Sequence, residues 1–199
     1  TDAGAFTILY GHRNGLRGRG AATFTAATPG VAGPAEPFAN VGAAATTGDF
    51  NRDEFDDVAV GAPGSGSGTS SGAGAVHIMY GSNRGIVKAD NIRLTQATNG
   101  VEGDREAHDA FGSSLAVGDF NNDRRDDLAV GTPGQRHNNN AGAGATQIFD
   151  GSHKGIPPAR NVIITQTSGD LFNGAAQDDR FGTSLAAGDF NGDGSDDLA

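Results

Sequence analysis

The sequence predicts an all-β fold made of four-stranded units that repeat about every 70 residues. Gly is the outstanding residue, with 33 copies in 199, and hydrophobic residues make up only 36% of the chain. Short apolar runs alternate with turns rich in Gly, Pro, Asn and Asp, and no stretch has a convincing helical period. Three sequence landmarks also recur in phase along the chain.

The landmarks justify the repeat one by one. A Gly-Asp-Phe-Asn segment begins at Gly48, Gly118 and Gly188. An Ala-Gly-Ala segment, which opens a short apolar run, begins at Ala3, Ala73 and Ala143. The segment 91–96 matches 161–166, and its first copy has drifted to 22–25. Three landmarks that keep the same step are typical of a repeat architecture.

Each repeat contains four candidate strands, all short and bounded by turn residues. In the middle copy we expect them at Ser113–Val117, Asp127–Gly131, Ala145–Phe149 and Asn161–Thr165. Four antiparallel strands per unit, repeated radially, predict the blades of a β-propeller. A β-sandwich is the alternative, but it does not predict such regular spacing. A calcium-stacked β-helix is excluded, because its period is near nine residues.

The phase of the repeat predicts how one propeller domain is divided. We expect strands three and four of a composite blade in 1–37, full blades in 38–107 and 108–177, and strands one and two of a further, composite blade in 178–199. Three blades are too few for a ring. Two interpretations follow: either the chain is a fragment of a longer one, or two copies join through composite blades into a six-bladed homo-oligomeric ring.

The charge and composition exclude several classes of partner. The net charge of −10 argues against nucleic acid and anionic membrane surfaces, which both need Lys and Arg patches. No apolar run approaches the roughly 18 residues of a membrane span, so no membrane insertion is expected. The absence of Cys excludes disulfides and thiolate metal sites. The first residues contain neither an initiator Met nor a signal peptide, which we interpret as a mature or trimmed chain.

Half of the 24 acidic residues are Asp residues in three nine-residue loops, 49–57, 119–127 and 189–197. Clustered negative charges destabilise a fold unless a cation compensates them. Side-chain oxygens fall at loop positions 1, 3, 5 and 9, and a backbone carbonyl near position 7 would supply a further ligand. The expected ligands are Asp49, Asn51, Asp53, Phe55 and Asp57; Asp119, Asn121, Asp123, Arg125 and Asp127; and Asp189, Asn191, Asp193, Ser195 and Asp197.

Hard oxygen ligands without His or Cys favour Ca²⁺ over zinc or copper, with about three sites per chain. Mg²⁺ is disfavoured because it resists replacing its water with an all-protein cage. Only the third loop has Gly at position 6, Gly194, where the others carry Glu54 and Arg124. If this position needs a positive φ, the non-Gly residues cost roughly 1–2 kcal/mol. We therefore predict weaker calcium binding in the first two loops.

Short motifs flank the acidic loops and carry a family resemblance. Phe111-Gly112 and Phe181-Gly182 precede two of the loops, while Gly61-Ala62-Pro63 and Gly131-Thr132-Pro133 follow two of them. The chain thus resembles the FG-GAP repeat of integrin α-subunit propellers and their bacterial relatives. The first copy departs from the pattern, with Val41-Gly42 in place of Phe-Gly. The resemblance implies a propeller with calcium on the loop between strands one and two of a blade, where the ion stiffens the blade and is not catalytic.

The resemblance also implies adhesion or recognition. We expect a secreted, calcium-binding, lectin-like or cell-adhesion module for a protein or carbohydrate ligand, because millimolar extracellular calcium suits exposed, imperfect loops. We expect no enzyme activity, since no non-repeating acid/base or nucleophile constellation is present. The five His residues do not recur in phase and are expected on the surface or in loops. The alternatives are a scaffold or accessory propeller of a polysaccharide lyase or hydrolase, and a purely structural, self-assembling propeller.

Overall fold

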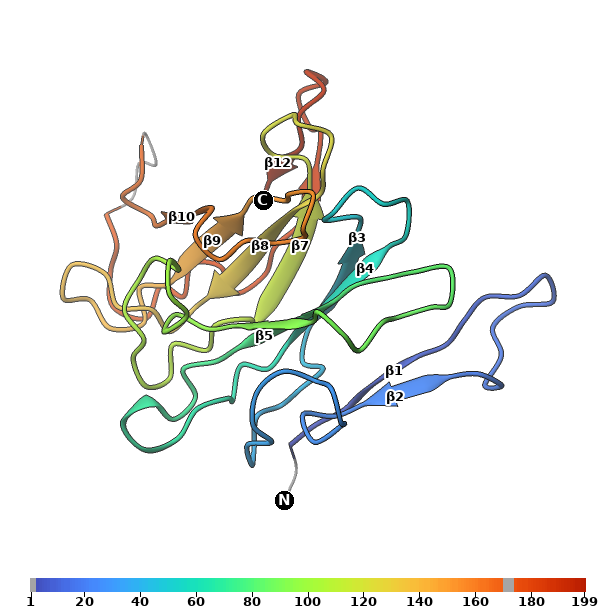
Figure 1. The fold of residues 1–199 in the computed structure, drawn as a ribbon. Helices are drawn as coiled ribbons and strands as arrows, with labels where there is room; N and C mark the ends of the chain where they lie inside the picture. Colours follow the sequence, from blue (N-terminus) through green and yellow to red (C-terminus); the bar gives the residue numbers. More distant parts are fainter. Residues whose placement is uncertain (1–2, 170–173) are drawn as a thin grey trace.

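The chain consists of short antiparallel strands in the computed structural model, which describes residues 3–169 and 174–199 (Figure 1). The strands are β1 (Phe6–Ile8), β2 (Ala22–Phe24), β3 (Ala45–Gly48), β4 (Asp57–Gly61), β5 (Val76–Met79), β6 (Ile92–Leu94), β7 (Ser114–Gly118), β8 (Asp127–Thr132), β9 (Ala145–Phe149), β10 (Asn161–Ile164), β11 (Ala187–Gly188) and β12 (Asp197–Leu198). One short 3₁₀ helix, η1, spans Gly68–Ser70. Residues 1–2 and 170–173, at the start of the predicted unit 1–37 and within the predicted unit 108–177, lie outside the described residues.

Among the described residues, the strands form two four-stranded sheets and two two-stranded ones. Strands β3–β4–β5–β6 make one antiparallel sheet and β7–β8–β9–β10 the next, while β1 pairs with β2 and β11 with β12. Each strand predicted for the second repeat is present, and its ends differ from the prediction by at most one residue. The all-β, four-stranded prediction is therefore confirmed. Within the described ranges, no helix has the length and hydropathy needed to cross a membrane.

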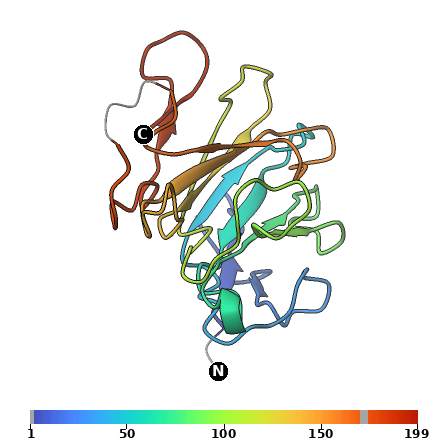
Figure 2. The same cartoon turned by 90° about the vertical axis from the view of Figure 1, so that its left-hand side faces the viewer.

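The sheets follow one another in chain order and pack through their faces (Figure 2). The first strands of successive repeats lie side by side, with β3 against β7 and β7 against β11. Every residue of β4 and β8, the second strands of the full sheets, is buried. One continuous core joins the two full sheets and includes Phe50, Ile78, Phe111 and Phe149, with the rings of Phe111 and Phe149 edge to face at 6.2 Å. Burial of both faces explains why β4 and β8 are nearly continuous apolar runs.

The repeated spacing of the Phe-Gly and Gly-Ala-Pro motifs has a structural cause, because the two motifs meet between neighbouring repeats. Phe111 forms a parallel bridge with Gly74, and its N–H donates to the carbonyl of Ala73 at 2.9 Å. A Cβ placed on Gly61 would lie 2.0 Å from the carbonyl oxygen of Gly112. The chain therefore needs Gly where backbone packs directly on backbone. The next pair of repeats has the same contact between Gly131 and the carbonyl of Gly182.

The expectation that all His residues lie on the surface or in loops is wrong for His77. It lies within β5 and is 2% exposed, and burial lowers the pKa of its imidazole to about 4. Its cross-strand partner is Arg93 on β6, which forms a 3.0 Å ion pair with Glu36 from the segment before β3. Because that segment reaches across the sheet, this face of β5 is covered. In the second repeat the equivalent position is occupied by Gln147, which is also buried.

Candidate functional site

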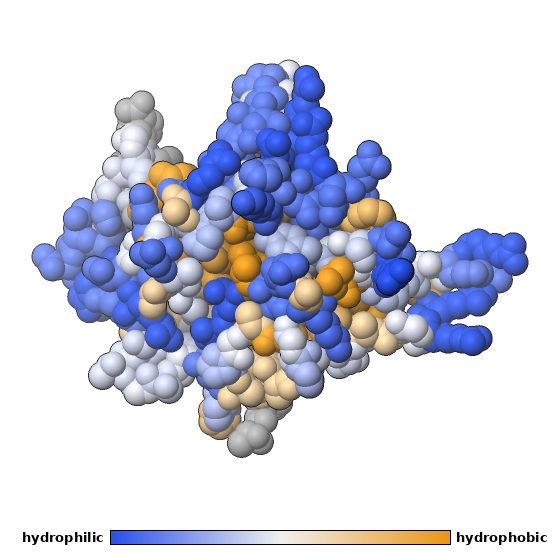
Figure 3. Space-filling model, viewed as in Figure 1, coloured by the Kyte–Doolittle hydropathy of each residue, from blue (hydrophilic) through white to orange (hydrophobic). Residues whose placement is uncertain are grey.

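The three acidic loops lie at the same end of the sheets, at the upper side of Figure 1. The loop 49–57 connects β3 to β4, the loop 119–127 connects β7 to β8, and the loop 189–197 connects β11 to β12. Each therefore joins the first two strands of a repeat. The surface of this end is predominantly hydrophilic (Figure 3).

The first residue of each loop organises the turn through its carboxylate. In the first loop the N–H of Asp53 donates to Asp49 Oδ1 and the N–H of Glu54 donates to Asp49 Oδ2, both at 2.9 Å. The N–H of Asp53 also reaches Asn51 Oδ1 at 2.9 Å. The side-chain oxygens of positions 1 and 3 thus meet at one amide, and the loop wraps around the Asp49 carboxylate.

The same hydrogen bonds occur in the other two loops. Asp119 accepts from the N–H groups of Asp123 and Arg124 at 2.9 and 2.7 Å. Asp189 accepts from those of Asp193 and Gly194 at 3.1 and 3.0 Å, and these backbone donors lower the pKa of its exposed carboxyl. A charged carboxylate surrounded by backbone donors is the form that this turn favours.

Each loop contains two residues with a left-handed backbone. At position 6 the φ angles are 73° for Glu54, 65° for Arg124 and 91° for Gly194, so the positive φ expected at this position is present in all three. Position 4 is left-handed as well, and there too only the third loop has Gly, Gly192 with φ 77°. The first two loops hold non-Gly residues in a conformation that costs them backbone strain.

The Asp at position 9 has a structural role in the first two loops. The carboxylate of Asp57 accepts from the N–H of Phe50 at 3.1 Å and from that of Gly81 at 2.8 Å, and Asp127 accepts from the N–H of Phe120 at 3.2 Å and of Gly151 at 2.8 Å. Both side chains are buried. Desolvation raises the pKa of Asp57 to about 7 and that of Asp127 to about 6. These carboxylates therefore tie the acidic loop to the turn between the third and fourth strands.

The predicted ligand residues are adjacent, but their carboxylates do not converge on one point. The Asn51 amide donates to Asp53 Oδ2 at 3.0 Å, and the Asn121 amide donates to Asp127 Oδ1 at 3.3 Å. No three acidic or imidazole side chains form a metal-ligating group among the residues that the structure describes. At position 7 the side chain of Arg125 forms an ion pair with Asp123 at 3.4 Å. The donors fit a hard cation in kind and in order along the loop, while their side chains face backbone amides and one another.

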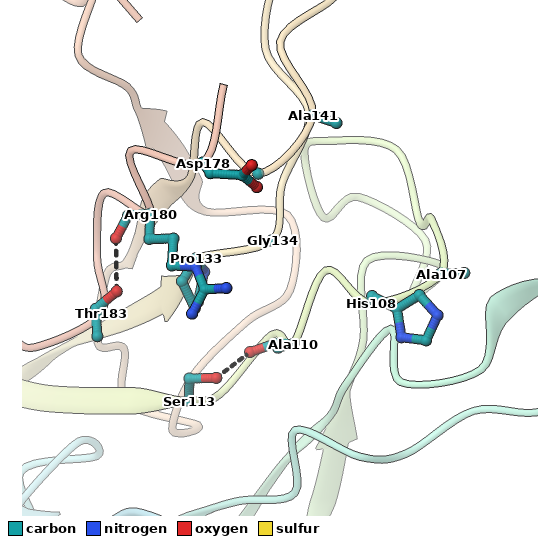
Figure 4. Close-up of a pocket in the computed structure, with 11 residues that line it drawn as sticks. Ala107, His108, Ala110, Ser113, Pro133, Gly134, Ala141, Asp178, Arg180 and Thr183 are labelled. Carbon is teal, nitrogen blue, oxygen red and sulfur yellow. Dashed lines mark hydrogen bonds between the residues drawn. The ribbon is translucent and has the colours of Figure 1, made fainter. Parts of the chain in front are cut away.

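A pocket of about 640 Å³ opens at the opposite end of the sheets (Figure 4). It lies between 107–113 and 133–142 of the second repeat and 178–183 of the third. Arg180 lies beside Pro133 on one side of the pocket, and His108 lies on the other side (Figure 4). Two lining hydroxyl groups donate to backbone carbonyls, Ser113 to Ala110 at 2.8 Å and Thr183 to Arg180 at 2.6 Å. The pocket thus presents a guanidinium, an imidazole and the carboxyl of Asp178 to a ligand.

Sequence reasoning did not identify this pocket. The repeat nevertheless contained a signal, because His108 and Asp178 occupy the same position in successive repeats, and Phe38 occupies it in the first. Unlike residues at equivalent positions can mark a loop surface that differs between repeats, although they also occur in the core, as at His77 and Gln147. A comparison of the repeats restricted to their loops would have pointed to this end of the molecule.

The chain matches the family model described as the FG-GAP repeat at residues 41–79, 111–149 and 181–199. It is 33% identical over 165 residues to a phosphatidylinositol-glycan-specific phospholipase D of Bos taurus, and 35% identical over 163 residues to the Homo sapiens protein of the same name. Both matches cover 81% of this chain and 18% of the relative, so the chain spans about a fifth of those proteins. Integrin alpha-E of Mus musculus is 38% identical over 95 residues, which cover 45% of this chain and 8% of the integrin.

Proposed function

Because this chain is an FG-GAP repeat protein, we propose that it is a secreted, calcium-binding β-propeller module that recognises a protein or carbohydrate partner and does no chemistry itself. The observation that carries the proposal is the threefold recurrence of one backbone arrangement. In each loop the first Asp accepts hydrogen bonds from the amides of positions 5 and 6. A single turn of this kind can be an Asx-turn that only connects two strands, but three copies in phase, each with Asp at positions 1, 5 and 9 and Asn at position 3, favour a bound cation.

Calcium would be held by the side-chain oxygens of positions 1, 3, 5 and 9 and by the backbone carbonyl of position 7. Those carbonyls, of Phe55, Arg125 and Ser195, accept no hydrogen bond from another backbone amide within the described residues. The ion supplies positive charge to loops of a chain with a net charge of −10. Its effect is structural, because it offsets the repulsion between the Asp residues and stiffens the connection between the first two strands of each blade.

The propeller itself belongs to the same proposal. Its support is that β3, β7 and β11, the first strands of successive repeats, adjoin one another, as innermost strands do around an axis. The two-stranded sheets β1–β2 and β11–β12 would be parts of further blades. A mass measurement in solution tests ring formation by assembly: a dimer of this chain supports it, and a stable monomer contradicts it.

The loop face opposite the calcium loops would carry recognition. Its pocket brings together a cation, an imidazole and a carboxyl from two repeats. Such a set of donors and acceptors suits hydroxyl-rich or peptide ligands, which need several hydrogen bonds fixed in one geometry. Calcium on the other side would hold the blades, and thus the pocket walls, in position.

Two experiments test the proposal. Isothermal titration calorimetry should detect about three calcium ions per chain, and calcium at 100 times Kd should stabilise the fold by about 2.7 kcal/mol for each site.

A glycan array, probed with and without a chelator, should show binding that calcium supports and that Arg180→Ala weakens. Arg160→Ala, outside the pocket, is the matched control. Absence of calcium binding in the titration would contradict the calcium-binding role. If no glycan on the array binds, the proposed partner is restricted to protein.

A second candidate function is an accessory module of a larger enzyme. The similarity to the phospholipases D over only 18% of their length favours it, since that share is compatible with one module among several. The chain alone should then leave phosphatidylinositol-glycan substrates intact. Hydrolysis by the purified chain would contradict a non-catalytic module.

A further inference from the structure

A carboxylate from each following repeat reaches the first residue of the preceding acidic loop. The N–H of Asp49 donates to Asp126 Oδ2 at 2.7 Å, and the N–H of Asp119 donates to Asp196 Oδ2 at 2.8 Å. Asp126 and Asp196 occupy position 8 of their own loops. They therefore lie between the expected calcium ligands at positions 7 and 9, and each hydrogen bond connects two neighbouring loops.

The glycine of each Gly-Asp-Phe-Asn segment makes room for this contact. A Cβ on Gly48 would lie 2.7 Å from Asp126 Oδ2, and a Cβ on Gly118 would lie 2.9 Å from Asp196 Oδ2. Any side chain at either position would displace the carboxylate from the amide that it accepts from. The close approach is thus specified by the sequence of both repeats and not by one exposed side chain alone.

Further contacts reinforce the connection. The N–H of Ser152 donates to the carbonyl of Phe50 at 3.2 Å, beside Gly151, whose N–H is held by Asp127. Between the second and third loops, the N–H of Asp196 also donates to the carbonyl of Asp119 at 3.0 Å. Position 1 of each earlier loop is therefore held by groups next to the ligand positions of the following loop.

From these contacts we infer that Asp126 and Asp196 are positioning residues that couple calcium binding between adjacent loops. The inference rests on the proposed calcium function. An ion in the second loop orders positions 7 and 9 and with them Asp126, which in turn fixes the amide of Asp49. The first loop then loses less conformational entropy when it binds its own ion, so its affinity rises. Linkage makes the coupling reciprocal.

A double-mutant cycle on the full chain isolates the coupling. Asp123→Ala removes a ligand of the second loop, and the calcium affinity of the first loop is followed through the amide NMR signal of Glu54. We expect Asp123→Ala to weaken the first loop about fivefold, at the low end of allosteric coupling. In a chain that already carries Asp126→Ala, the same substitution should leave the first loop unchanged.

Two variants separate the hydrogen bond from loss of charge. Asp56 is the equivalent residue of the first loop, and it is exposed. Asp56→Ala should preserve the fivefold effect of Asp123→Ala on the Glu54 signal. Asp126→Asn keeps a neutral acceptor and should restore part of the coupling. Because Asp123→Ala removes the second ion in every background, the repulsion between ions in adjacent loops changes by the same amount in each comparison.

The outcomes are distinct. If all three loops bind calcium but Asp123→Ala leaves the calcium affinity of the first loop unchanged, the coupling is wrong and the calcium function stands. If Asp56→Ala abolishes the effect as Asp126→Ala does, the cause is charge and the assigned role of Asp126 is wrong. If no loop amide responds to calcium, the proposed function fails and the coupling fails with it.

Discussion

The first and third acidic loops share one sequence pattern but differ in their surroundings. The first is packed against the next sheet, so Phe50 is fully buried, whereas Phe190 at the same position of the third loop is 64% exposed. The third loop has Gly at both left-handed positions, while the first holds Arg52 and Glu54 there. The repeat thus encodes the same turn twice, once strained and supported by a neighbour, and once relaxed and exposed.

The largest expected difference between the two loops is in how much stability the fold loses when the aromatic residue at position 2 is removed. Phe50→Ala removes a buried ring from the core between the sheets and should lower the free energy of unfolding by about 4 kcal/mol. Phe190→Ala should change it by less than about 0.5 kcal/mol. Urea denaturation of the two variants in the presence of chelator measures both values. Equal losses would mean that the two loops are supported alike.

Removal of the Asp at position 9 should also destabilise the first loop more than the third, by a smaller amount. Asp57→Ala leaves the buried amides of Phe50 and Gly81 without an acceptor, which should cost about 2–3 kcal/mol. Asp197 accepts from the amide of Phe190 in a more exposed setting, and Asp197→Ala should cost less than about 1 kcal/mol. Both free energies of unfolding are measured without calcium, so that loss of a ligand does not contribute.

The same comparison between repeats predicts how the stability of the fold depends on pH, because His77 in β5 is replaced by Gln147 in the next repeat. The pKa of His77 is about 4 in the folded chain, below its ordinary 6.5, so the unfolded chain takes up a proton first as the pH falls. Stability from this group is present above pH 6.5 and is lost progressively towards pH 4, with a loss of about 2 kcal/mol at pH 5. His77→Gln, which copies Gln147, should remove that part of the pH dependence. An unchanged difference between pH 7 and pH 5 would contradict the assignment.

The smallest expected effect concerns strain and calcium affinity. Gly at position 6 predicts that the third loop binds calcium most tightly. Arg124→Gly should relieve about 1 kcal/mol of backbone strain in the ion-bound loop. It should tighten the second loop by up to about fivefold, because an ion-free loop can leave the left-handed conformation and an ion-bound loop cannot. Arg124→Gln removes the same charge but keeps the strain, so it serves as the control. Calorimetric titration measures the affinities, and equal affinity at all three sites would refute the predicted ranking.

Much of the fold follows from the sequence because its signals are local and repeated. The runs around Val60, Val130 and Ile148 predict strands, and the turn residues between them set the strand ends. The fixed step of the Gly-Asp-Phe-Asn segments identifies equivalent loops. Gly194 is a local signal as well. It suggested that position 6 of the loop needs a positive φ, and Glu54 and Arg124 have a positive φ at that position.

Contacts between distant segments could not be predicted in the same way. His77 lies beside Arg93 on the neighbouring strand, and Arg93 pairs with Glu36, which lies far from both in sequence. The role of Asp126 depends on the amide of a residue in another repeat. Neither contact leaves a pattern in its own segment, because burial and pairing between repeats are set by how the sheets pack.

The junction of Gly61 with the backbone of Gly112 has a consequence for how such a chain can change in length. Each full repeat carries a Phe-Gly segment, or Val41-Gly42 in the first, for the repeat before it and a Gly-Xaa-Pro segment for the repeat after it. A unit of about 70 residues that is duplicated or deleted as a whole therefore leaves every remaining junction complete. A shorter insertion at the same place would separate two backbones that have no side chains with which to adapt. The repeat is thus the unit in which the chain can gain or lose length without breaking its packing, and the glycines at the junction, Gly61 and Gly112, mark where one unit meets the next.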